Sequence, residues 1–182
     1  MLVFEKPGKE NTEKTLEIAF DRAQRDSLWL LVATTTGETA VLAAKEAQRR
    51  GVLDRLIIVG SVPDKGVQKM TPENQKILSD MKVPVVFTTH VLSGAERGLS
   101  TRFHGVYPVE IIAHSLRMLS QGVKVAVEIS VMALDCGVLP YGVPVVAVGG
   151  TGRGADTACV VTPAGGNAIL DCKVHEILCK PY

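Results

Sequence analysis

Continuous apolar runs of strand length alternate with helix-like segments along most of this chain. The runs predict strands at 27–34, 54–60, 83–89, 123–130, 143–150 and 156–163, and an edge strand near 168–179. Helices are predicted between them at 11–27, 37–51, 71–82 and 107–122, with a short one at 131–137. Strands that are apolar on both faces and separated by helices indicate a mostly parallel sheet covered on both sides.

The last predicted strands follow one another too closely to leave room for a helix, so that edge of the sheet should be antiparallel. No linker, repeat or low-complexity segment divides the 182 residues. We therefore predict one domain over residues 1–182, an α/β fold with three layers (α/β/α) and a mostly parallel, doubly wound sheet. A chain of this length is long enough to bury a full core.

Composition excludes several classes of protein. Twenty basic residues against nineteen acidic ones give a net charge near +1, and no lysine- or arginine-rich block is present. This balance gives no sign of a nucleic-acid partner. The N-terminus lacks the apolar core of a signal peptide, and no stretch approaches the ~20 apolar residues of a membrane helix.

Four cysteines occur at positions 136, 159, 172 and 179, without CxxC or zinc-like spacing. We interpret them as reduced and mostly buried thiols in a cytoplasmic protein. The histidines form neither an HxxxH nor an HExxH pattern, which argues against a metal site. No GxSxG sequence supports a serine hydrolase.

In doubly wound sheets the ligand lies beyond the carboxyl ends of the strands. The first such junction reads TTTGETA at residues 34–40. Free backbone amides and the positive end of the helix dipole favour an anion at this point, and threonine hydroxyls add donors. The alternative is a plain threonine helix cap. The predicted binding residues at this junction are Thr35, Thr36, Gly37, Glu38 and Thr39.

The first junction is neither a P-loop nor a GxGxxG turn, which disfavours a triphosphate with magnesium and a dinucleotide. A terminal monophosphate fits it better. A second glycine-rich loop, GGTGRGAD, follows the strand at 143–150. Its predicted binding residues are Gly150, Thr151, Gly152, Arg153, Gly154 and Asp156. Arg153 is suited to a phosphate or a carbonyl, whereas Asp156 is suited either to a sugar hydroxyl or to capping a turn.

The segment 88–105 is predicted to be a long binding loop or lid, with His90, Ser93 and Gly94 nearest the site. Glu128 is predicted at the end of the strand at 123–130, where a carboxylate needs a partner. It is suited to binding hydroxyls or an imide N–H, or to acting as a base. The alternatives are a structural pair with an arginine and a helix cap. Asp135 is expected to be structural.

These two glycine-containing loops resemble the C-terminal α/β domain of pyruvate kinase, and more closely a group of small stand-alone proteins classed with that domain. In the enzyme the first loop has a lysine where this chain has Thr35, and it holds a phosphate of a sugar bisphosphate. Acidic Glu38 also departs from what a doubly charged sugar requires. The catalytic barrel of the enzyme has no counterpart in the sequence, so the resemblance implies no pyruvate kinase activity.

The resemblance to the stand-alone proteins implies flavin mononucleotide (FMN) as cofactor. One phosphate, a polyol chain and a flat ring match the ligand expected from the loops, and the ring is expected near Met132, Leu134, Leu139 or Tyr141. A flavin-dependent oxidoreductase is the first hypothesis. A non-catalytic sensor of a sugar phosphate or nucleotide is the alternative, and a hydrolase or transferase using Glu128 and His90 is a weaker third. Whether the protein is an enzyme stays open, and the exposed sheet edge makes a homo-oligomer an expectation.

Overall fold

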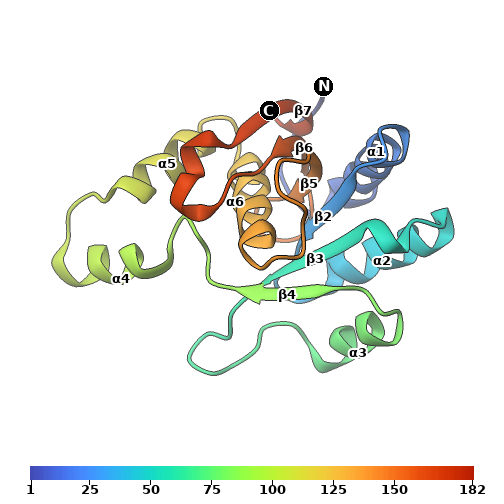
Figure 1. The fold of residues 1–182 in the computed structure, drawn as a ribbon, viewed down its shortest axis with the longest axis horizontal. Coiled ribbons are helices and arrows are strands. Elements are labelled where there is room, and N and C mark those ends of the chain that lie inside the picture. The colour runs from blue at the N-terminus through green and yellow to red at the C-terminus, as the bar shows by residue number, and fades with distance from the viewer.

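The computed structural model describes residues 1–182 and contains one seven-stranded sheet, in the order β1-β7-β6-β5-β2-β3-β4 (Figure 1). Its strands are β1 (Leu2–Phe4), β2 (Trp29–Ala33), β3 (Leu56–Ser61), β4 (Val85–Thr88), β5 (Val145–Gly149), β6 (Thr157–Thr162) and β7 (Lys173–Pro181). The neighbours β5, β2, β3 and β4 are parallel. β6 is antiparallel to both β5 and β7, which confirms the predicted antiparallel edge.

Helices cover both faces of the sheet. They are α1 (Thr12–Arg25), α2 (Glu38–Arg50), α3 (Pro72–Asp80), α4 (Gly94–Phe103), α5 (Pro108–Arg117) and α6 (Gln121–Asp135). One buried cluster joins α1, α2 and α3 to one face of the sheet, and a second joins α6 to the other face. Leu30 and Val32 belong to the first cluster and Leu31 to the second, as the alternation of side chains along β2 requires. The predicted three-layer α/β/α fold is confirmed.

Two helix ends carry residues that favour such ends. Thr71 caps α3, because its hydroxyl accepts a hydrogen bond from the Asn74 amide at 3.3 Å and Pro72 opens the first turn. Gly51 ends α2 with a φ of 70°, the left-handed conformation that glycine adopts without strain.

The prediction of a strand at 123–130 is wrong. These residues form the middle of α6, which also takes in residues 131–135 of the short helix predicted at 131–137. The helix is enclosed by β5, β6 and α5, so eleven of its residues, Gly122–Lys124 and Ala126–Ala133, are buried. A helix that is apolar on almost every side shows no amphipathic period, and its Val and Ile residues imitate a buried strand.

Two further elements were absent from the prediction. The segment expected to be a long loop contains α4, and the N-terminal residues form β1, which pairs in parallel with β7. β1 has only three residues, and no residue of α4 is buried. Both elements therefore lack the buried periodic pattern on which sequence interpretation depends.

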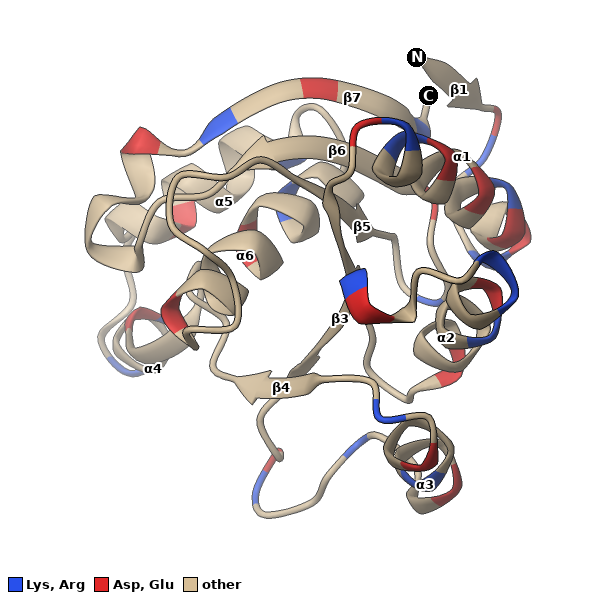
Figure 2. Cartoon of the chain, turned by 45° about the vertical axis from the view of Figure 1, so that its right-hand side comes forward, with Lys and Arg blue, Asp and Glu red and all other residues tan.

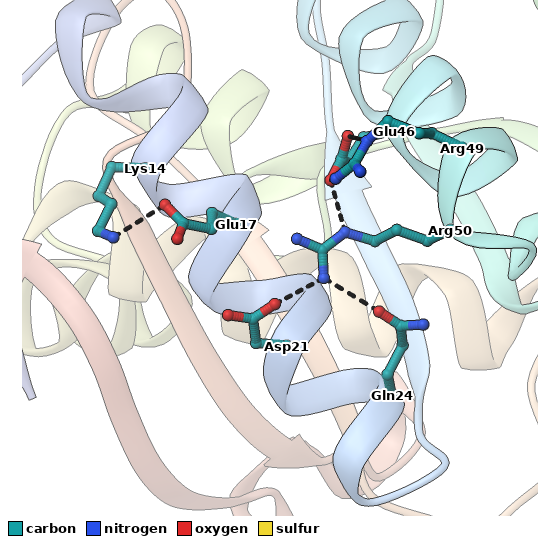
Figure 3. Close-up of polar contacts among 7 residues, drawn as sticks. All are labelled: Lys14, Glu17, Asp21, Gln24, Glu46, Arg49 and Arg50. Carbon is teal, nitrogen blue, oxygen red and sulfur yellow. Dashed lines mark hydrogen bonds and ion pairs between the residues drawn. The ribbon is translucent and has the colours of Figure 1, made fainter.

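A network of charged side chains joins α1 to α2 (Figure 3). The guanidinium of Arg50 on α2 donates to Asp21 at 2.6 Å and to Gln24 at 3.0 Å, both on α1, and it lies over the ring of Phe20. Glu46, one turn earlier on α2, accepts from both Arg49 and Arg50. These two arginines lower the pKa of Glu46 to about 2. Charges of both signs alternate along these helices (Figure 2).

We expect Glu46→Gln to lower the free energy of unfolding by about 0.5–1 kcal/mol at neutral pH, the size of a partly exposed ion-pair network. The folded pKa of Glu46 lies below its ordinary value of 4.5. Its contribution is therefore complete above that value and is lost as the pH falls toward about 2. Urea unfolding of the unaltered protein and of Glu46→Gln should give two free energies of unfolding whose difference becomes smaller as the pH falls from neutral toward about 2. Glu13→Gln, at an exposed position of α1, is the control, and a difference that does not depend on pH would contradict the prediction.

Candidate functional site: a pocket at the carboxyl edge of the sheet

A pocket of about 250 Å³ opens where β5, β2, β3 and β4 end, between the start of α2 and one side of α6. Each of these parallel strands delivers its following residues to the same edge of the sheet. The residues that line the pocket are Ala33, Thr34, Thr35, Thr36, Glu38, Thr39, Val59, Gly60, Ser61, His90, Gln121, Val125, Ile129, Met132, Gly150, Gly152, Arg153 and Gly154.

The start of α2 supplies hydrogen-bond donors to this pocket. The backbone amides of Glu38, Thr39 and Ala40 donate to no acceptor in the protein, and no side chain caps this end of the helix. They are the unsatisfied donors of a helix N-terminus, where the helix dipole adds positive potential. Thr35, Thr36 and Thr39, whose hydroxyls are further possible donors, also line the pocket. The arrangement is that of an anion-binding site.

Gly37 shapes the turn before α2. Its φ of 94° is unfavourable for any residue with a side chain, and a Cβ here would lie 2.6 Å from the Cβ of Asn74. The Asn74 side chain donates to the carbonyl of Thr36 at 3.0 Å, and the Gly37 amide donates to the Thr34 hydroxyl at 3.0 Å. Gly37 therefore lies behind the pocket, where it sets the path of the backbone.

The glycine-rich loop after β5 forms a second wall, and the start of α1 supports it. The Thr12 hydroxyl accepts from the Ala155 amide at 3.0 Å and donates to the Lys9 carbonyl at 2.7 Å. Gly154 has a φ of 75°, and a Cβ there would lie 2.4 Å from the Thr12 oxygen. This close approach leaves Arg153 at the exposed end of the loop, lining the pocket.

Asp156 is fully buried and is absent from the pocket lining. One carboxylate oxygen accepts from the amides of Gly8 and Thr151, each at 3.1 Å, and the other accepts from the Thr157 hydroxyl at 2.8 Å. The side chain thus joins the N-terminal segment to the glycine-rich loop. Of the two roles that the sequence left open for Asp156, the structure shows the one that holds a turn.

One side of α6 forms an apolar wall. Gln121, Val125, Ile129 and Met132 recur at helical spacing and all line the pocket. Of the four residues expected near the ring of a ligand, Met132 lines the pocket. Leu139 belongs to the core instead, and Tyr141 is 81% exposed. Leu134 packs against the core cluster beneath α6.

Glu128 lies on α6, fully buried, at the side of the pocket next to β4. Its Oε1 accepts from the Leu92 amide at 3.0 Å, and its Oε2 contacts both Lys124, one turn earlier on α6, and Nδ1 of His90 at 3.0 Å. Glu128 therefore reaches the pocket through His90, whose ring lines it. This placement corrects the expected position of Glu128 at the end of a strand.

The surroundings of this buried group perturb two pKa values. Burial alone would raise the pKa of Glu128, but the His90 hydrogen bond and the charge of Lys124 outweigh it and hold the pKa below its ordinary range. Burial lowers the pKa of Lys124, and the nearby Glu128 charge offsets this only in part. Titratable groups perturbed in this way and set beside a cleft are a common feature of functional sites.

The predicted site residues therefore fall into two groups. Those in the pocket wall are Thr35, Thr36, Glu38, Thr39, His90, Gly150, Gly152, Arg153 and Gly154. Those outside it are Gly37, Ser93, Gly94, Glu128, Thr151 and Asp156. Ser61, Gln121, Val125 and Ile129 line the pocket without having been predicted. The i,i+4 spacing of Lys124 and Glu128 was the available sign that this segment is a helix.

No three His, Cys, Asp or Glu side chains are grouped so that they could hold a metal ion. None of the helices has the length and apolar character needed to span a membrane.

The fold and the pocket define a doubly wound α/β protein in which a helix N-terminus and a glycine-rich loop meet in one pocket at the carboxyl edge of the sheet. The family model "Pyruvate kinase, alpha/beta domain" matches residues 13–161. The chain belongs to this family. The match covers both pocket loops and all of α6.

We expect Asp156→Asn to destabilise the protein by about 1–3 kcal/mol, because an amide nitrogen cannot accept the hydrogen bonds now made to the carboxylate. Chemical unfolding without any added ligand measures this loss. Asp171→Asn, at the exposed last residue of the 3-10 helix Gly166–Asp171, is the matched control. A variant as stable as the unaltered protein would show that the three donors do not depend on the charge of Asp156.

Proposed function

We propose that the pocket binds flavin mononucleotide. The observation that carries the proposal is the pairing of two unlike surfaces in one pocket: unpaired amides and hydroxyls at the start of α2, and an apolar wall on α6. A ligand with one phosphate and a flat ring satisfies both. A flavin supplies redox chemistry when bound, while the protein contributes its position and electrostatic surroundings.

The phosphate would lie at the start of α2. There it would accept hydrogen bonds from the amides of Glu38 and Thr39 and from the hydroxyls of Thr36 and Thr39. The ribityl chain would cross the pocket from α2 toward α6, with Arg153 of the glycine-rich loop available to its oxygens. The ring would lie against Val125, Ile129 and Met132 of α6. Pockets that combine an apolar lining with a few placed polar groups are typical of cofactor sites.

The charge of the pocket argues against a bisphosphate. Arg153 is the one lysine or arginine in its lining, and the acidic Glu38 also lines it. Glu38 approaches Lys9 at 3.8 Å, a long pair between exposed side chains. A second phosphate would meet Glu38 without a further cation in the lining. One phosphate group therefore suits the pocket better than two.

The most direct test is the visible absorption spectrum of the purified protein, followed by heat release of any chromophore. We expect a yellow protein that contains FMN in near-stoichiometric amount. The apoprotein should be stabilised against heat by added FMN. Stabilisation by sugar phosphates or another nucleotide, without any effect of FMN, would instead support the non-catalytic sensor.

We expect the double substitution Thr36→Ala plus Thr39→Ala to weaken FMN binding by about 1–3 kcal/mol, because two hydrogen bonds to a charged group are lost. Fluorescence titration of the apoprotein with FMN measures the change in affinity. Thr101→Ala, at an exposed position of α4, should leave binding unchanged. Equal affinity in the double variant would place the phosphate away from α2.

A further inference from the structure

His90 lies at the side of the pocket opposite the glycine-rich loop. It follows β4, whereas that loop follows β5, and β2 and β3 lie between these two strands. The start of α2 follows β2, on the glycine-rich loop's side of β3. A ligand whose phosphate lies on α2 and whose ring lies against α6 would bring that ring toward His90, which contacts Glu128 of the same helix.

The His90 ring makes a hydrogen bond through only one of its two nitrogens. Its Nδ1 lies 3.0 Å from Oε2 of Glu128, its side chain is 46% exposed, and the residue lines the pocket. The two nitrogens of an imidazole point away from each other. Nε2 is therefore directed away from Glu128 and has no partner in the chain.

The chemistry of Glu128 determines which His90 nitrogen carries hydrogen. The carboxylate is surrounded by donors, Lys124 and the Leu92 amide among them, and an ionised carboxylate only accepts hydrogen bonds. Nδ1 must therefore carry a hydrogen. In the neutral imidazole Nε2 then bears a lone pair, the arrangement by which a buried carboxylate sets the tautomer of a histidine base.

We propose that His90 is the group that recognises the ring of the ligand: its Nε2 accepts a hydrogen bond from a ring N–H, and Glu128 is the positioning residue that keeps this lone pair available. The inference rests on the proposed function. In oxidised FMN the ring N–H is that of the imide, N3–H. The charged groups around His90 are Lys124 and Glu128 of α6, and across the pocket Glu38 and Arg153.

The first test compares FMN with its N3-methyl derivative, which cannot donate from that nitrogen. At mildly alkaline pH we expect the unaltered protein to bind FMN about tenfold more tightly than the derivative, the size of one hydrogen bond. His90→Phe keeps a ring but has no acceptor, so its preference should disappear. His114→Phe, at an exposed position of α5, should retain it.

The second test needs no ligand. Nitrogen-15 NMR of the histidine rings in the apoprotein should show His90 in the Nδ1–H form, with Nε2 unprotonated. Glu128→Gln should populate the Nε2–H form and reduce the preference for FMN over its derivative. Rescue of that preference by Glu128→Asp would support positioning by the carboxylate.

The outcomes separate the two proposals. Failure of the unaltered protein to bind FMN would overturn both the proposed function and this inference. FMN bound with the same affinity as its N3-methyl derivative would overturn the inference alone, as would an Nε2–H tautomer in the apoprotein. A preference that persists in His90→Phe would assign the imide to another residue.

Discussion

The parallel pairing of β5, β2, β3 and β4 is the constraint on which the site depends. Parallel strands end at the same edge, so the glycine-rich loop, the TTTGET turn, Ser61 and His90 come together although they lie far apart in the chain. The helix that starts after β2 brings unpaired amides to the middle of this row. No single loop makes the pocket, and its polar groups differ in chemistry from one strand end to the next.

α6 completes the pocket because it passes along this edge. Near its start, Gly122 packs against Thr157 and Gly149, and two turns later Glu128 reaches His90 beyond β4. The contact with Gly149 and Thr157 is close enough that a Cβ at Gly122 would lie 2.1 Å from the Thr157 hydroxyl. The buried contact of Glu128 with Lys124 then lets an otherwise apolar helix carry a carboxylate at its pocket side. The same helix therefore supplies both the apolar wall and the group that orients His90.

The sequence was sufficient to predict the layers, the antiparallel edge and the two pocket loops, because each leaves a local pattern of apolar runs, caps and glycines. It was not sufficient for α6, whose burial on almost every side hides the helical period. That one error misplaced Glu128 and concealed Val125 and Ile129 as pocket residues. Asp156 is a different case. The sequence places Asp156 in the glycine-rich loop. Only the structure shows that its carboxylate accepts hydrogen bonds from the amides of Gly8 and Thr151.

The residues that support the glycine-rich loop lie outside the part of the chain that matches the family. Gly8, Lys9 and Thr12 hold this loop, and all three precede residue 13, where the family match begins. The family match therefore covers the residues that line the pocket, whereas residues that precede the match support one of its walls. A substitution at Gly8 or Thr12 would therefore disturb that wall without removing any residue that lines the pocket.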